Sequence, residues 1–114
     1  MSKMSVAVSR ATRDALRVLG NQVKLGRYAR SWTVAELAAR LGVNPRTVSA
    51  IESGAPTVSI GTVFNAAVLT GVDLFGLTGP DLARARRAGE ETLALLPEKV
   101  RKPEVKDSVD DFAF

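Results

Sequence analysis

The chain of 114 residues contains no cysteine and no histidine. The missing cysteines exclude disulfide bonds, thiolate zinc sites and a cysteine nucleophile, and the missing histidines remove the commonest general base. No nucleophile–base pair and no group of metal ligands can be assembled from the residues that remain. We therefore expect no enzymatic activity, no bound metal and no cofactor.

Long apolar runs are also missing. No stretch approaches the roughly 18 apolar residues that span a bilayer, and the first ten residues lack an apolar core of signal-peptide length. With 46% hydrophobic and 25% charged residues, the composition is that of a globular protein. The sequence predicts a cytoplasmic protein with no membrane partner, built as one domain with an appended segment.

Positive charge is concentrated in the first half of the chain. The net charge is +4, but residues 1–60 contain nine basic and three acidic residues, whereas residues 61–114 contain seven basic and nine acidic ones. A local positive field attracts the phosphate backbone of nucleic acids and supplies affinity that does not depend on sequence. Scattered surface arginines are common without such a role, so charge alone is only supporting evidence.

Two short helices joined by a tight turn are predicted in the middle of the chain. Thr33 and Glu36 have the Thr-x-x-Glu spacing of a capping box, which begins the first helix, and Gly42 favours the left-handed conformation that ends it. Asn44 is a suitable cap for the second helix, with Pro45 at its first position. This arrangement is typical of a helix-turn-helix, whose second helix can enter the DNA major groove.

The outward positions of the second helix are short or basic hydrogen-bonding residues, which suit phosphates and base edges. An ordinary solvated face more often has Glu and Lys, although an ordinary helical hairpin within a bundle remains the alternative. Pro45 has no donor group, and Ala50 offers only an apolar contact, for instance to a thymine methyl. The predicted DNA-binding residues are Thr33, Asn44, Pro45, Arg46, Thr47, Ser49 and Ala50.

Apolar spacing predicts two further helices around this pair. One occupies the last part of residues 11–30, where Gly20 and Gly26 interrupt the helical spacing, and another begins at the Ser59 cap and continues to about Thr70. The expected apolar positions are Leu16, Leu19, Val23 and Tyr28 in the first and Ile60, Val63, Phe64 and Ala67 in the second. After them comes a connector in which Leu74 and Phe75 are expected to be buried.

The C-terminal part is predicted to be a helix followed by a charged tail without periodicity. In the helix, Glu90 and Glu91 are placed to pair with arginines one turn earlier. The predicted organisation is a flexible N-terminus (residues 1–10), a helix-turn-helix DNA-binding domain (11–79), a C-terminal helix (80–97) and a charged tail (98–114).

These residues resemble a known family. Leu19-Gly20, Arg27, Glu36-Leu-Ala38, Leu41-Gly-Val43, Thr47-Val-Ser49, Ile51-Glu52 and Gly54 are similar to the motifs of phage-repressor and xenobiotic-response-element (XRE) type regulators. The resemblance implies an all-α fold: a five-helix lambda-repressor-like DNA-binding domain, here with a C-terminal helix and a flexible tail. It also implies a partly buried structural ion pair between Arg27 and Glu52, which composition alone would place in solvent.

A narrower resemblance comes from residues 54–62, 72–76, 95–101 and 109–112. These segments are similar to HipB-like antitoxins, which pair with HipA-like kinase toxins and repress their own operon. The resemblance implies a homodimer on palindromic double-stranded operator DNA and a HipA-like kinase partner. The tail then offers partner-binding residues, namely Asp110, Asp111 and Phe112.

Two positions depart from the family pattern. Val34 stands where the family usually has a glutamine that contacts the DNA backbone. Pro45, second in the recognition helix when the Asn44 cap is counted as first, cannot donate a hydrogen bond. Two alternatives therefore stay open: a plain dimeric XRE-type repressor without a toxin partner, and a protein-binding adaptor that no longer contacts DNA. The tail, in turn, has the composition of a solvated chain end.

Overall fold

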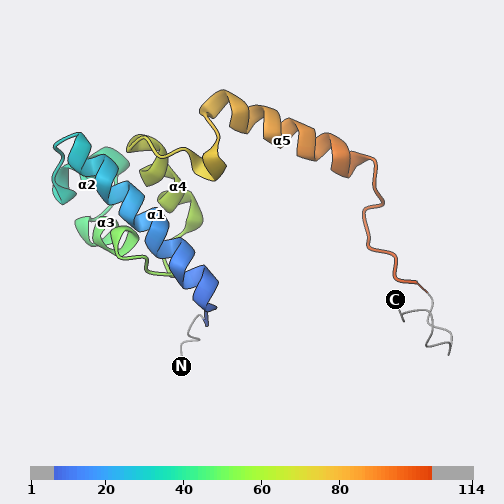
Figure 1. Cartoon of the computed structure of the whole chain (residues 1–114), viewed down its shortest axis with the longest axis horizontal. Coiled ribbons are helices and arrows are strands. Elements are labelled where there is room, and N and C mark those ends of the chain that lie inside the picture. Colours follow the sequence, from blue (N-terminus) through green and yellow to red (C-terminus); the bar gives the residue numbers. More distant parts are fainter. Residues whose placement is uncertain (1–6, 104–114) are drawn as a thin grey trace. The chain divides into compact units, whose positions relative to one another are not determined.

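Five α-helices make up most of the computed structural model, which describes residues 7–103 (Figure 1). They are α1 (Arg10–Ala29), α2 (Val34–Leu41), α3 (Pro45–Glu52), α4 (Ile60–Leu69) and α5 (Gly79–Ala94), with a short 3-10 helix η1 (Leu74–Gly76) before α5. Residues 7–103 contain no strand, so the predicted all-α fold is confirmed. The chain divides into two compact units, of which the first ends at Gly79 and the second begins at Pro80.

Side-chain caps begin the first four helices. Ser9, Thr33, Asn44 and Ser59 each accept a hydrogen bond from a backbone N–H of the following turn. Both reciprocal bonds of the predicted capping box are present in α2, and Gly42 ends that helix at a φ of 73°. Because Ser9 caps α1, its first residue is Arg10, which the sequence assigned to the N-terminal segment.

The core of the first unit lies where α1, α2, α3 and α4 meet. Each helix contributes buried apolar residues from its inward side, as amphipathic spacing predicts. The buried apolar residues are Val23 of α1, Leu37 and Ala38 of α2, Val48 and Ile51 of α3, Val63, Ala66 and Ala67 of α4, and Leu74 of η1. This core fixes the orientation of α3 relative to the other three helices.

Three apolar residues expected inside lie outside. Tyr28 is 60% exposed, because the inward position at the end of α1 is occupied by Arg27. Ile60 is 69% exposed, since it is the first residue of α4 and the buried face of that helix begins one turn later. Phe75 has a left-handed backbone conformation (φ 57°), is 77% exposed, and meets the half-buried Phe64 edge to face.

Helix α5 buries none of its residues and is held by local pairs. Arg86 and Glu90 form an ion pair of 2.7 Å, which confirms the pairing predicted for Glu90, and Arg84 pairs with Asp81. Glu91 makes no ion pair within residues 7–103, so its predicted pairing is wrong. Of the helices within residues 7–103, none combines the length and the apolar character needed to cross a membrane.

Candidate nucleic-acid interface

The core anchors α3 through one side only. Val48 is fully buried and Ile51 is 3% exposed, and both face the core. The turn between α2 and α3 is closed by a hydrogen bond of 3.0 Å from the Val43 N–H to the Ala38 carbonyl oxygen. The opposite side of α3 therefore faces solvent, and the hydrogen-bonded turn fixes its orientation relative to α2.

The predicted DNA-binding residues of α3 lie on this outward side. Arg46 and Ser49 are exposed, and Thr47 and Ala50 are half-buried at its edges. Within residues 7–103, the Arg46 guanidinium makes no hydrogen bond or ion pair. Its five donors are consequently free for a ligand.

Asn44 and Pro45, also exposed, have local roles at the start of α3. The Asn44 Oδ1 accepts a hydrogen bond of 2.8 Å from the Arg46 backbone N–H, so its carbonyl oxygen serves as the cap. Its amide nitrogen remains available as a donor. Pro45 occupies the first helical position, where its missing N–H costs nothing.

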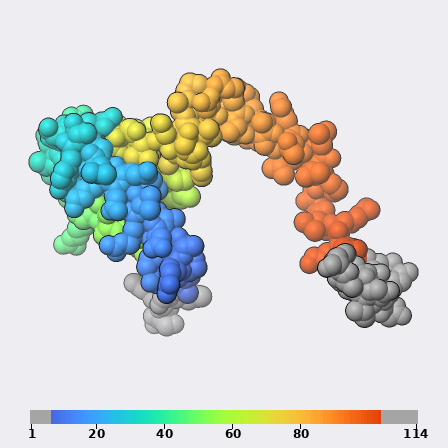
Figure 2. Space-filling model, viewed as in Figure 1, coloured from blue at the N-terminus to red at the C-terminus, as the bar shows by residue number. Residues whose placement is uncertain are grey.

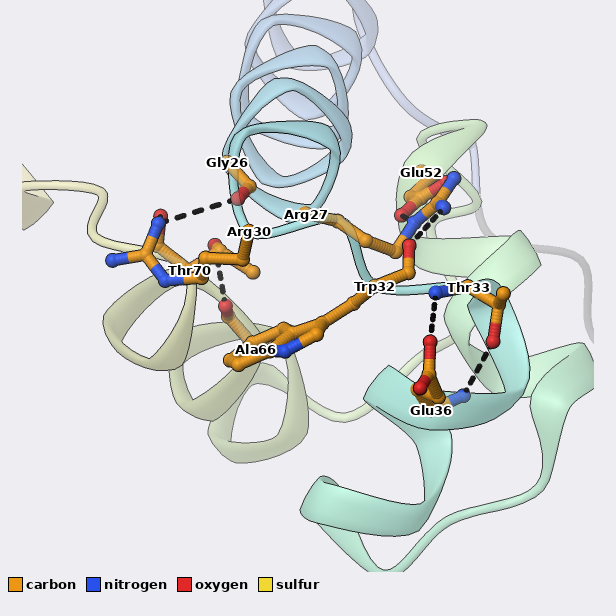
Figure 3. A network of polar contacts seen from close by, with 9 residues as sticks. All are labelled: Gly26, Arg27, Arg30, Trp32, Thr33, Glu36, Glu52, Ala66 and Thr70. Carbon is orange, nitrogen blue, oxygen red and sulfur yellow. Dashed lines mark hydrogen bonds and ion pairs between the residues drawn. The ribbon is translucent and has the colours of Figure 1, made fainter.

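Thr33 lies at the N-terminus of α2, next to the same surface. Its hydroxyl oxygen accepts the Glu36 N–H at 3.0 Å, while the Glu36 carboxylate accepts the Thr33 N–H at 2.7 Å (Figure 3). These bonds from Thr33 lower the pKa of Glu36. Thr33 is exposed at the positive end of α2, where an anion would be stabilised.

A buried ion pair joins α1 to the end of α3. The Arg27 Nε and Nη2 atoms donate to the two carboxylate oxygens of Glu52 at 2.6 and 2.9 Å, and the Nη1 atom donates to the Trp32 carbonyl oxygen at 2.9 Å (Figure 3). The two charged side chains are only 8% and 7% exposed. The bonds to Glu52 raise the pKa of Arg27, and the pair fixes the position of α3.

Two further arginines counted in the basic half of the chain also serve the fold. Arg30 donates to the Thr70 carbonyl oxygen at 2.8 Å and so ties α1 to α4. The Arg40 guanidinium carbon lies 4.2 Å from the centroid of the Trp32 ring. Only part of the positive charge therefore remains for a nucleic acid.

Sequence reasoning missed two residues beside the recognition face. Lys24 and Tyr28 of α1 line a shallow hollow together with Ser49 and Ser53. The signal that points to Lys24 is its helical spacing from the arginines earlier in α1. The predicted partner-binding residues Asp110, Asp111 and Phe112 lie outside the described residues.

Comparison with known proteins agrees with this geometry. Residues 24–77, slightly less than half of the chain, match the model of the helix-turn-helix family, which supports the resemblance to XRE-type regulators. The chain gives no significant match to a curated protein or to a solved structure. Residues 24–77 therefore form a helix-turn-helix of the type found in DNA-binding transcription regulators.

Proposed function

We propose that the chain is a sequence-specific DNA-binding transcriptional repressor that reads base edges with α3. The observation that supports this most directly is the contrast between the two sides of α3. One side is anchored by Val48, Ile51 and the Glu52 ion pair, whereas the other presents Arg46 with all its donors free. A rigid helix with free donors is what direct readout in the major groove requires.

Each outward residue has a role that follows from its chemistry. Arg46 suits bidentate donation to a guanine edge, and the free amide nitrogen of Asn44 suits an acceptor on a neighbouring base or phosphate. Ala50 suits a thymine methyl, and Thr33 a phosphate at the start of α2. The two-fold symmetry of a homodimer would match a palindromic operator with half-sites about 34 Å apart.

The central test is the substitution Arg46→Ala. We expect it to weaken binding to a duplex obtained by selection from random DNA by about 1–3 kcal/mol, because one bidentate base contact is lost. Binding to a scrambled duplex should change much less. Arg87→Ala, which removes an exposed arginine of α5, is the control and should leave the preference between the duplexes unchanged.

The outcome also separates the alternatives. An equal loss of affinity on both duplexes would show that Arg46 contacts only phosphates. No binding to either duplex by the unchanged protein would contradict the repressor and favour the adaptor, for which Val34 and Pro45 are the supporting residues.

We further propose that this repressor is a HipB-like antitoxin that autoregulates its operon and binds a HipA-like kinase toxin. The support is the sequence resemblance in residues 54–62, 72–76, 95–101 and 109–112. In this proposal Asp110 and Asp111 meet a basic surface of the kinase, and Phe112 is an apolar anchor. A plain dimeric repressor would have no use for such an acidic and aromatic segment.

A further inference from the structure

Four basic residues form a line along α1. Arg10, Arg13, Arg17 and Lys24 are separated by three, four and seven residues, so they share one side of the helix. All four are exposed, and within residues 7–103 none of their charged groups makes a hydrogen bond or ion pair. The Lys24 Nζ atom lies 6.0 Å from the centroid of the Tyr28 ring. We call this set the α1 stripe; the first turns of α1 lie on the surface of the first unit (blue in Figure 2).

The α1 stripe lies on the flank of α1 that meets the end of α3. Gly20 has the same helical phase, and a Cβ atom there would lie 2.5 Å from the Ile51 carbonyl oxygen. In the loop that follows α3, a Cβ atom on Gly54 would lie 2.9 Å from Arg17 Cγ. Contacts with α3 and its following loop thus fix the orientation of the stripe.

Two shallow hollows lie between the stripe and neighbouring segments, one at α3 and one at the loop that follows it. Lys24 lines one of them with Ser49 and Ser53, and Ser49 belongs to the outward side of α3. Arg13 and Arg17 line the other with the loop residues 53–56. The stripe therefore begins beside the proposed base-reading residues and continues along the loop that follows α3.

The loop that follows α3 and the helix α4 contain no positively charged residue that could bind a nucleic acid. Residues 53–72 contain no Lys, Arg, Asp or Glu. On this side of α3, the positive charge available to phosphates comes from α1. Three of the four stripe residues precede Lys24, where the helix-turn-helix match begins, so they lie outside the matched segment.

We propose that the α1 stripe binds the phosphate backbone of the DNA that flanks the base pairs read by α3. This inference depends on the proposed DNA-binding function and adds a second contact surface to it. At 1.5 Å per residue, the stripe is roughly 20 Å long, which corresponds to about six base-pair steps of 3.4 Å. Neutralisation of these phosphates would release counterions, so the contact has a measurable salt signature.

The test compares two double variants of the full chain. Arg13→Gln with Arg17→Gln removes two stripe charges, and the glutamine that replaces Arg17 keeps the Cγ atom that lies beside Gly54. Arg87→Gln with Arg101→Gln removes the same charge from exposed positions in the second unit. Binding constants are measured between 50 and 200 mM KCl on a selected duplex with ten-base-pair flanks and on a scrambled duplex of equal length.

We expect the stripe variant to lower the magnitude of the slope of log K against log [KCl] by about 1.8, which is 0.9 for each lost phosphate contact. Its affinity should fall by the same factor on both duplexes, and removal of the flanks should abolish the difference from the unchanged protein. The control variant should keep the original slope.

Two results would overturn the inference alone. Equal slope changes in both variants would show an effect of net charge, and an unchanged slope in the stripe variant would show that no phosphates are contacted there. If the unchanged protein binds neither duplex, the proposed function fails together with the inference.

Discussion

Arg27 and Glu52 form a buried ion pair on which the stability of the first unit depends. Each is an ordinary surface type by composition, yet their side chains are 8% and 7% exposed and joined by two hydrogen bonds. A guanidinium left in this position without its carboxylate would be buried and uncompensated. The pair therefore matters for stability, because it ties the last residue of α3 to α1.

The substitution Glu52→Ala should lower the free energy of unfolding by about 3 kcal/mol, because it leaves the Arg27 charge buried without a partner. Chemical denaturation measures this loss. The control is Glu90→Ala, which breaks the exposed pair with Arg86, 59% and 62% exposed, and should cost under about 1 kcal/mol. Equal effects of the two substitutions would contradict the structural role of the buried pair.

At the scale of the elements, α1 depends on glycine where it crosses its neighbours. A Cβ atom on Gly20 would lie 2.5 and 2.7 Å from the carbonyl oxygens of Ile51 and Glu52. A Cβ atom on Gly26 would meet the carbonyl oxygen of Thr70 even more closely. Two residues that appear in the sequence as interruptions of a helix thus allow α1 to approach α3 and α4.

Gly20→Ala should therefore destabilise the first unit by about 1–3 kcal/mol, since the backbones of α1 and α3 must separate to make room. Helix propensity alone predicts the opposite sign, a gain of roughly 0.5–1 kcal/mol. Gly89→Ala in α5, where nothing lies within 4 Å of an added Cβ, should show that gain as increased helicity. Thermal unfolding followed by circular dichroism measures both, and a higher melting temperature for Gly20→Ala would refute the close approach.

At the scale of the whole molecule, the first unit supplies the recognition helix, while the proposed partner contact lies in the tail. We expect truncation after Pro97 to leave folding, dimerisation and operator binding nearly unchanged, because residues 98–114 are highly charged and contain few apolar residues. The truncated chain should lose the proposed kinase partner, because Asp110, Asp111 and Phe112 are removed.

Two measurements check this expectation. Light scattering compares the masses of the full and truncated chains, and affinity capture compares the amount of a co-expressed HipA-like kinase that each retains. Equal retention would refute the role of the tail. The contact with the kinase would then be assigned to α5, through Arg84, Arg86 and Arg87. Loss of the kinase together with loss of operator binding would indicate a folding defect instead.

The sequence by itself determined the elements that depend on neighbouring residues. Caps and breakers act within one turn of the chain, so Thr33, Gly42 and Asn44 mark their helix ends in any fold that contains these helices. The residue types of the second helix likewise marked Arg46 and Ser49 as outward candidates, and both are exposed on α3.

The tertiary structure alone decided the positions that depend on how helices cross. It placed Tyr28 outside and made Gly20 a contact point, and it divided the arginines into structural ones, such as Arg30 and Arg40, and free ones. Burial and the Arg27–Glu52 pairing depend on residues far apart in the chain, whereas capping, periodicity and the Arg86–Glu90 pair depend on residues close together. Only the latter can be read from the order of the amino acids.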